Sequence, residues 1–241
     1  SLVFLILFAG CSYDNCNIKT NESFKQITVQ NLITDIYSVN NLSGFNSFLL
    51  ENKNVLYPFY EVEDTSFLLD KVANAFTLID NVYFDSLYND VNTHFENPLN
   101  LFYPLDNSFT KFNQQSNYKL SPNITILISG FFNDVIVDKE NIVIGLDYFL
   151  PKTNKYKPRD LPSYILDRYS PEYINSISLS SYLSQFNLIN ESDLTMINEM
   201  ISFGKLYYVV SKLLPCTEQR IILGYSEKEF ELVNKNEAFI Y

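Results

Sequence analysis

Three short runs of β-branched residues lie close together in the middle of the chain, at 124–128, 135–137 and 142–144. Such residues favour strands, where their branched side chains fit the pleated surface. Polar residues at 133–134 and 138–141 separate the runs, as is typical of turns. We therefore predict a small three-stranded antiparallel sheet over about residues 124–147, and it constrains the fold more than any other segment.

Apolar residues recur every three or four positions on both sides of this predicted sheet, which is the period of an amphipathic helix. The stripes comprise Leu68, Val72, Ala75, Phe76 and Ile79; Phe84, Leu87, Tyr88, Val91 and Phe95; and Leu194, Ile197, Ile201, Gly204, Tyr208 and Leu213. Asp64 can cap the first helix, while Pro98 and Pro215 follow the second and the third and end them. Helices are thus expected before and after the sheet.

Further helix starts follow the sheet. Pro162 suits a first helical turn, and residues 170–171, Ser-Pro, form an N-cap followed by a proline at the first helical position. Ser226 and Glu229 have the spacing of a capping box for a last helix. No C-cap signal follows that helix, so we expect the natural protein to continue. The predicted fold class is α+β, with a single domain at 24–241.

The first eleven residues form an apolar run that ends in Ala9, Gly10 and Cys11. Small residues before a cysteine are typical of a bacterial lipoprotein signal, in which the cysteine is acylated, for instance with palmitate, and becomes the new N-terminus. The run of about seven residues is far too short to span a bilayer, which takes roughly 20. We predict a truncated signal peptide at 1–10, cleavage after Gly10, and a lipidated N-terminus with a flexible tether at 11–23. A clipped soluble leader or a buried strand is the alternative.

The charge balance excludes one class of partner. Seventeen Lys and Arg against 28 Asp and Glu give a formal net charge of −11, which repels phosphate backbones. Nucleic acid is therefore not expected as a partner, and a lipid anchor is left to hold the chain on a membrane. The mean hydropathy is near zero, and the rest of the sequence contains no segment long and apolar enough to cross a bilayer.

The chain contains three cysteines, Cys11, Cys16 and Cys216. If Cys11 is lipidated, the other two could pair outside the cytoplasm. Cys16 lies in the polar tether, however, and no sequence pattern brings it near Cys216. We favour two unpaired thiols over a disulfide.

The sequence lacks the residues of the common hydrolases. A zinc-protease helix needs two histidines one turn apart, and a Ser-His-Asp or Cys-His system needs one beside the nucleophile. The single histidine, His94, lies at the end of a predicted helix and is expected to face solvent. The six glycines form no nucleophile elbow, phosphate loop or dinucleotide motif. We predict no catalytic residue, no metal site and no cofactor.

Two weaker features leave alternatives open. Carboxylate pairs such as Asp134 with Asp138, or Glu172 with Glu199, could support an unusual acid–base hydrolase. Among 28 acids, however, such pairs are expected by chance. Aromatic residues make up 16% of the chain, and an exposed patch of Tyr and Phe would favour a protein interface.

The C-terminal half resembles a known family in the order of its motifs. These are Phe-Gly-Lys-Leu-Tyr-Tyr at 203–208, Leu-Leu-Pro at 213–215, Leu-Gly-Tyr-Ser-Glu-Lys-Glu at 223–229, Asn-Lys-Asn-Glu at 234–237, and upstream segments at 128–131, 144–150, 161–165 and 170–174. The pattern is similar to the gliding-motility lipoprotein family GldB of the Bacteroidota. The resemblance covers about 120–241, weakly extends to 85–95, and agrees with a lipidated Cys11. It implies a periplasmic, envelope-anchored component of the gliding apparatus and the associated type IX secretion machinery.

A fainter likeness concerns the fold alone. A short sheet followed by two helices, the second entered near residues 203–205, resembles the zincin metallopeptidase layout. The helix at 171–186 would then hold the paired histidines, but no metal-ligand type occurs at 173–179. A zincin-like fold here would therefore be degenerate, metal-free and inactive.

Three functions follow in order of preference. The first is a non-enzymatic lipoprotein that works through contacts with other envelope or gliding-machinery proteins. Its interaction surface would contain Tyr173, Gly204, Lys205, Tyr207 and Tyr208. The second is a periplasmic lipoprotein that binds a ligand or peptide in a relic cleft between the sheet and the helix at 171–186. The third is the carboxylate hydrolase.

Overall fold

The computed structural model of the protein describes residues 23–62, 68–159, 161–187 and 195–240. A mixed four-stranded sheet lies at its centre, formed by β1 (Thr28–Asn31), β2 (Asn123–Leu127), β3 (Val135–Val137) and β4 (Asn141–Gly145) in the order β1-β2-β4-β3. β1, β2 and β4 run parallel, while β3 runs antiparallel to β4 at one edge. The predicted α+β fold class is confirmed.

The predicted pairing of the strands is wrong in two respects. β2 and β4 are parallel neighbours, so only the β3–β4 pair is antiparallel. A fourth strand, β1, pairs with β2 through the register Thr28 to Asn123. Its four residues, Thr-Val-Gln-Asn, carry too few apolar side chains to mark a strand, and they pair with a segment far away in the sequence. Turn residues near β3 show where strands end but not which strands become neighbours.

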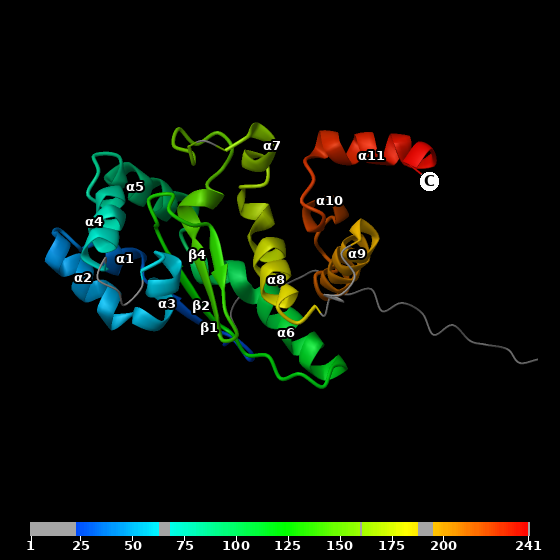
Figure 1. The fold of residues 1–241 in the computed structure, drawn as a ribbon, viewed down its shortest axis with the longest axis horizontal. Helices are drawn as coiled ribbons and strands as arrows, with labels where there is room; N and C mark the ends of the chain where they lie inside the picture. Colours follow the sequence, from blue (N-terminus) through cyan, green and yellow to red (C-terminus); the bar gives the residue numbers. More distant parts are fainter. Residues whose placement is uncertain (1–22, 63–67, 160, 188–194, 241) are drawn as a thin grey trace, which may run out of the picture.

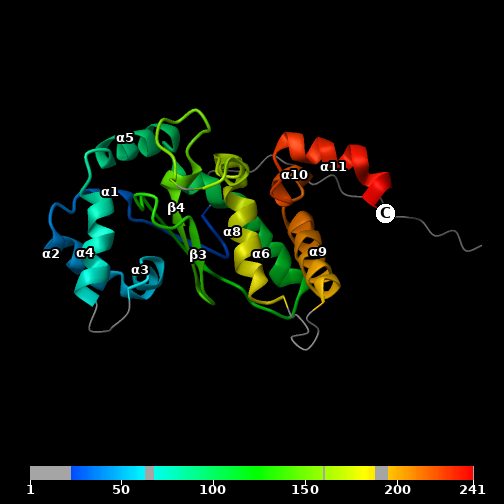
Figure 2. The same cartoon turned by 45° about the horizontal axis from the view of Figure 1, so that its top comes forward.

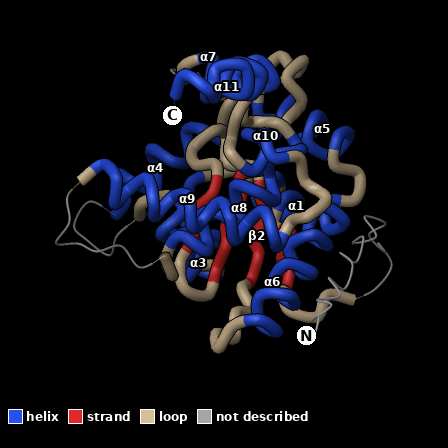
Figure 3. Tube along the Cα trace, turned by 90° about the vertical axis from the view of Figure 1, so that its right-hand side faces the viewer, coloured by secondary structure: helices blue, strands red, loops and turns tan. Residues whose placement is uncertain are grey.

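Helices cover both faces of the sheet (Figure 1). Their bounds are α1 Ile33–Tyr37, α2 Leu42–Glu51, α3 Lys53–Phe59, α4 Leu68–Ile79, α5 Phe84–His94, α6 Tyr103–Gln115, α7 Ser163–Leu166, α8 Ile174–Ser184, α9 Met196–Leu213, α10 Gln219–Ile222 and α11 Glu227–Ile240, with short 3₁₀ turns at Pro98–Phe102, Leu146–Phe149 and Pro171–Tyr173. α1 and α3 contact β2 and β4 from one side, and α8 contacts β3 and β4 from the other. α9 packs outside α6 and α8, and α10 and α11 follow at the same end of the molecule (Figures 2 and 3).

Two of the three predicted apolar stripes are confirmed. Val72, Ala75 and Ile79 of α4 are buried, as are Phe84, Leu87 and Val91 of α5, and all join one continuous core. Pro98 opens the 3₁₀ turn that follows α5. The predicted cap Asp64 lies outside the described residues.

The capping box before α11 is also confirmed. The backbone N–H of Ser226 donates to Glu229 Oε2 over 2.8 Å, and the N–H of Glu229 donates back to Ser226 Oγ over 3.3 Å. These hydrogen bonds lower the pKa of Glu229.

The stripe predicted for α9 is wrong, because the helix is rotated relative to the expected orientation. Its buried side chains are Ser202, Leu206, Val210 and Leu213. Of the predicted stripe only Leu213 is buried, and Leu194 lies outside the described residues. Ile197, Ile201 and Tyr208 instead face solvent. α9 has apolar residues on more than one side, so the 3.6-residue period did not show which side faces the core.

Two buried carboxylates fix backbone segments that reach the sheet. Asp106 of α6 accepts the backbone N–H groups of residues 25, 26 and 27 over 2.9, 2.7 and 3.2 Å, just before β1. Asp147, directly after β4, accepts the N–H of Ser129 over 2.8 Å and that of Phe131 over 2.6 Å, and it also accepts the Ser129 hydroxyl. The loop after β2 is thereby held to the end of β4.

The prediction of two unpaired thiols is wrong, because Cys216 forms a disulfide bond. This cysteine lies just after α9. The chain has three cysteines, so its partner is Cys11 or Cys16, both outside the described residues. Roughly 200 residues separate Cys216 from either of these cysteines, and for that reason no local sequence pattern could reveal the disulfide bond.

The predicted signal peptide and tether, including Gly10 and Cys11, also lie outside the described residues. Among the described helices, none combines the length and the apolar character that a bilayer span requires.

Candidate functional site

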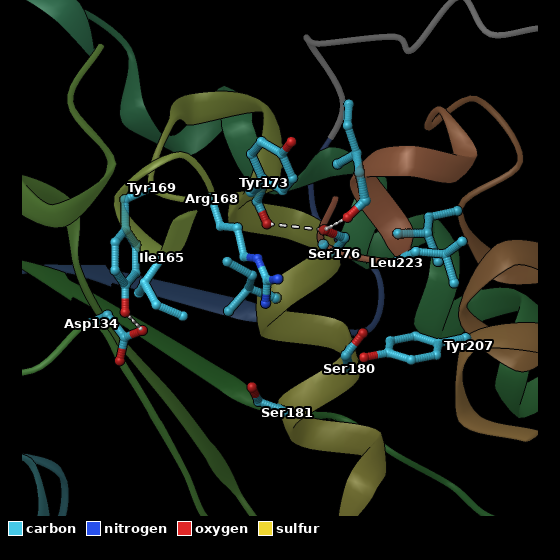
Figure 4. A pocket seen from close by; sticks show the side chains of 14 residues that line it. Asp134, Ile165, Arg168, Tyr169, Tyr173, Ser176, Ser180, Ser181, Tyr207 and Leu223 are labelled. Carbon is cyan, nitrogen blue, oxygen red and sulfur yellow. Dashed lines mark hydrogen bonds between the residues drawn. The ribbon is translucent and has the colours of Figure 1, made fainter. Parts of the chain in front are cut away.

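A cleft of about 280 Å³ opens beside α8, between the edge strand β3 and the helices α9 and α10. Tyr173, at the end of the 3₁₀ turn before α8, lines it together with Ser176 and Ser180 on successive turns of α8. The sequence predicted a cleft between the sheet and the helix at 171–186. This cleft shares that helix, but none of its lining residues belongs to a strand, and it meets the sheet side only through Asp134, in the loop before β3. Figure 4 shows that the side chains in it come from the β3 side, from the segment after α7, and from α8 and α9.

The β3 side of the cleft is formed by Asp134 and Tyr169. The Tyr169 hydroxyl donates to Asp134 Oδ2 over 2.7 Å, and the N–H of Val135 donates to Oδ1 over 2.6 Å. Burial, and then the negative charge of Asp134, raise the pKa of Tyr169. Both oxygens of Asp134 are thus engaged, so this carboxylate serves to fix the loop before β3.

The opposite wall is held by Tyr173, Arg220 and Glu172. The Tyr173 hydroxyl donates to the carbonyl of Tyr225 over 2.7 Å and accepts from Arg220 Nη1 over 3.2 Å. Arg220 also forms an ion pair with Glu172 over 3.2 Å. Burial raises the pKa of Tyr173, against an opposing effect of Arg220. Ser176 Oγ adds a bond to the carbonyl of Ile221 over 3.1 Å, so α8 and α10 are joined by polar contacts.

Arg168 extends into the middle of this cleft (Figure 4). Its Nε atom is buried and has no hydrogen-bond partner in the described part of the chain. Sequence analysis missed this residue, since a single arginine in a loop after a short helix carries no motif.

A second feature is an apolar face on α9. Met196, Ile197, Met200, Ile201, Phe203 and Tyr208 are all exposed, Met196 at 75%, Met200 at 65% and Ile201 at 56%. We call these six residues the α9 apolar face. At 3.6 residues per turn Ile197, Met200, Ile201 and Tyr208 lie opposite the buried side of the helix, while Met196 and Phe203 lie at its edge. Beside it runs a mostly apolar groove of about 330 Å³ lined by Phe112, Phe186 and Val209 among others.

The five predicted interaction residues are divided between these two features. Tyr173 and Tyr207 line the cleft, and Figure 4 shows Tyr207 pointing toward Ser180. Lys205 and Tyr208 line the groove beside the α9 apolar face. Gly204 lies between them on the exposed side, where an added Cβ atom would meet nothing within 4 Å.

Three of the carboxylates considered for catalysis, Asp134, Asp138 and Glu172, have structural partners. His94 is exposed at the end of α5, as expected, with its ring 4.9 Å from that of Phe95. Glu172 pairs with Arg220, and Asp138 caps the β3–β4 turn through the N–H groups of Glu140 and Asn141. Within the described ranges, no group of three or more His, Cys, Asp or Glu side chains could hold a metal ion.

Comparison with protein families identifies the chain. The family model described as "Gliding motility protein GldB" matches residues 14–241. The protein belongs to the GldB family. The model's lipoprotein label implies association with the cell envelope, and membership implies a role among the envelope components of gliding motility. No curated protein and no solved structure matches the chain, so the likeness to zincins stays a prediction.

Proposed function

We propose that this protein is a non-enzymatic lipoprotein, anchored through Cys11 with its folded body in the periplasm, and that it serves gliding motility and type IX secretion by binding another envelope protein. The observation that carries this proposal is the α9 apolar face. Family membership supports the role in gliding. The absence of a second histidine supports a role through contacts.

The α9 apolar face has the composition of the centre of a protein interface. Met and aromatic side chains are enriched there and charged residues are depleted, while the rim is polar. Lys205 and Lys212 flank the face, and the Lys212 ammonium lies 5.2 Å from the centre of the Tyr208 ring. Methionine side chains such as Met196 and Met200 adapt readily to a partner's surface. We therefore infer a partner with an apolar patch of its own.

The energy available from this face is large enough to hold a partner. Burying one exposed Met or Ile side chain contributes roughly 1.5–3 kcal/mol, and each 1.4 kcal/mol corresponds to about tenfold in affinity. Placing an aspartate at Met200 or Ile201 removes that contribution and adds the cost of burying a charge. Either substitution should weaken binding by at least about tenfold.

The test is complementation of a strain that lacks its own copy of the gene. The variant Met200→Asp/Ile201→Asp should fail to restore spreading on agar, although it reaches wild-type levels in the membrane fraction. The matched control is Leu69→Asp, at an apolar α4 residue that is 70% exposed, and it should restore spreading fully. Full spreading with the α9 double variant would refute the proposed interface.

The anchor has a separate test. Cys11→Ser should move the protein from the membrane to the soluble fraction without changing its unfolding temperature. A variant that still sediments with membranes after a carbonate wash would contradict lipidation of Cys11.

A further inference from the structure

The Arg168 guanidinium in the cleft beside α8 is a charged donor without an acceptor. Its Nε atom is buried, and within the described part of the chain the group forms no hydrogen bond or ion pair. Leaving a buried donor unsatisfied is costly, and native proteins do so rarely. An arginine that lines an open cleft without a hydrogen-bond partner in the described part of the chain can receive an anionic ligand there.

The side chain is held in place without using its hydrogen-bonding capacity. The guanidinium carbon lies 5.8 Å from the centre of the Tyr164 ring, a cation–π contact. On the other side is Gly224, with φ +69°, where an added Cβ atom would lie 3.7 Å from Arg168 Cδ. The carboxylate of Glu229 accepts the N–H of Ser226 at Oε2 and is near enough for the Arg168 charge to help lower its pKa, but it forms no hydrogen bond or ion pair with Arg168. Arg168 thus stays oriented while its donors remain available.

The charges around the cleft select the kind of anion. Arg168 is the only cation and Asp134 the only carboxylate among the residues that line it, and Asp134 is engaged by Tyr169 and Val135. A single positive charge suits a monoanion better than a phosphate dianion. A guanidinium also matches the two oxygens of a carboxylate in a planar, bidentate arrangement.

The other residues that line the cleft offer hydroxyl groups and apolar surface to the part of the ligand beyond its carboxylate. Ser180, Ser181 and Tyr207 offer hydroxyl groups, and Ile165, Ile177 and Leu223 offer apolar surface. We propose that this cleft binds a carboxylate attached to an apolar group, with Arg168 as its bidentate donor. The C-terminus of a peptide and a free organic acid share this chemistry. The site lies apart from the α9 apolar face, so it can be tested independently of the proposed function.

Calorimetric titration of the full chain tests the proposal with five probes. N-acetyl-leucine and the peptide acetyl-Ala-Ala-Leu, both with a free carboxylate, should bind saturably. N-acetyl-leucine amide and inorganic phosphate should bind far more weakly. Tighter binding of the peptide than of 4-methylpentanoate would identify a peptide C-terminus as the source, and the reverse order a free acid. Equal binding of the amide, tighter binding of phosphate, or no saturable binding of either acid would overturn the proposal.

Variants locate the site and separate binding from folding. Arg168→Met should weaken binding of N-acetyl-leucine by roughly 10- to 100-fold, the contribution of charge-assisted hydrogen bonds. Arg168→Lys should retain part of the affinity, while Arg159→Met, at an exposed arginine, should bind like wild type. Because Arg168 loses only the cation–π contact with Tyr164 and its attraction to Glu229, Arg168→Met should lower the unfolding temperature only slightly. Wild-type affinity in Arg168→Met, or a loss of stability equal to that of a structural arginine, would refute the assignment.

Discussion

Asp147→Ala is the substitution whose effect on stability the structure defines best. Asp147 is fully buried and accepts the backbone N–H of Ser129 over 2.8 Å and that of Phe131 over 2.6 Å. It also accepts the Ser129 hydroxyl, which in turn accepts the N–H of Phe132 over 3.1 Å. Phe131 has φ 62° after Gly130 with φ 68°, and such a left-handed residue costs roughly 1–2 kcal/mol unless its surroundings support it. Without the carboxylate, this loop loses its main support.

The expected loss follows from these contacts. A buried backbone N–H left without an acceptor costs roughly 1–3 kcal/mol. Asp147→Ala leaves one such group, the N–H of Ser129, together with the partly buried N–H of Phe131. The variant also no longer has to bury the charged carboxylate of Asp147, and this gain offsets part of the cost. We expect the free energy of unfolding to fall by about 2–4 kcal/mol, which for a chain of this size lowers the unfolding temperature by roughly 4–16 °C. Urea denaturation followed by circular dichroism measures it. Asp70→Ala, on the exposed side of α4, is the control, and an Asp147→Ala loss no larger than that of the control would refute the reasoning.

The stabilising effect of Asp147 should also depend on pH, in a direction that its pKa shift defines. Burial raises the pKa of Asp147 above its ordinary value of 3.8, although the bonds from Ser129 and Phe131 oppose the shift. The folded protein therefore holds this proton more tightly than the unfolded chain does. Stability from this group grows as the pH falls through the raised pKa toward 3.8, and it is lost as the pH rises. The difference in unfolding free energy between wild type and Asp147→Ala should thus widen on acidification below neutrality. A constant difference would contradict the burial of this charge.

Three further predictions concern other parts of the chain. Gly145→Ala should destabilise the fold in urea denaturation, since its Cβ atom would collide with the backbone oxygen of Asn133. Gly204→Ala should stabilise the fold by up to about 1 kcal/mol through helix propensity, and the opposite order of the two variants would contradict the close contact at Gly145. Peptide mapping without reducing agent should recover Cys216 bound to Cys16, because the proposed lipid would occupy the sulfur of Cys11, and a bond between Cys216 and Cys11 would contradict the anchor. Asp106→Ala should expose the amide hydrogens of residues 28–31 to faster exchange, since it removes the acceptor that fixes the start of β1, and unchanged exchange there would argue against that role.

The sequence predicted those elements that local periodicity defines. The stripes of α4 and α5, the capping box of Ser226 and Glu229, and the β-branched runs of β2 to β4 were all read correctly. Each of these sequence patterns spans only a few residues, so it can be recognised without knowing which other elements pack against it. The residues that anchor them, such as Val72 and Leu87, are buried as expected.

The features that depend on distant contacts could not be predicted. β1 acquires its role only by pairing with β2, and Cys216 only by its bond to the N-terminal part of the chain. α9 carries apolar residues on more than one side, and only its packing against α6 and α8 shows which of them are buried. The cleft was expected beside α8, but Arg168 became visible only when its surroundings were known.

Photo-cross-linking in living cells tests the proposed interface most directly. A photoreactive amino acid at position 200, on the α9 apolar face, should yield one discrete adduct with an envelope protein, and the same probe at position 69 of α4 should not. The adduct at position 200 should disappear when Ile201→Asp is added. Equal adducts at both positions, or an adduct that persists in the Ile201→Asp background, would contradict the claim that this face binds the partner.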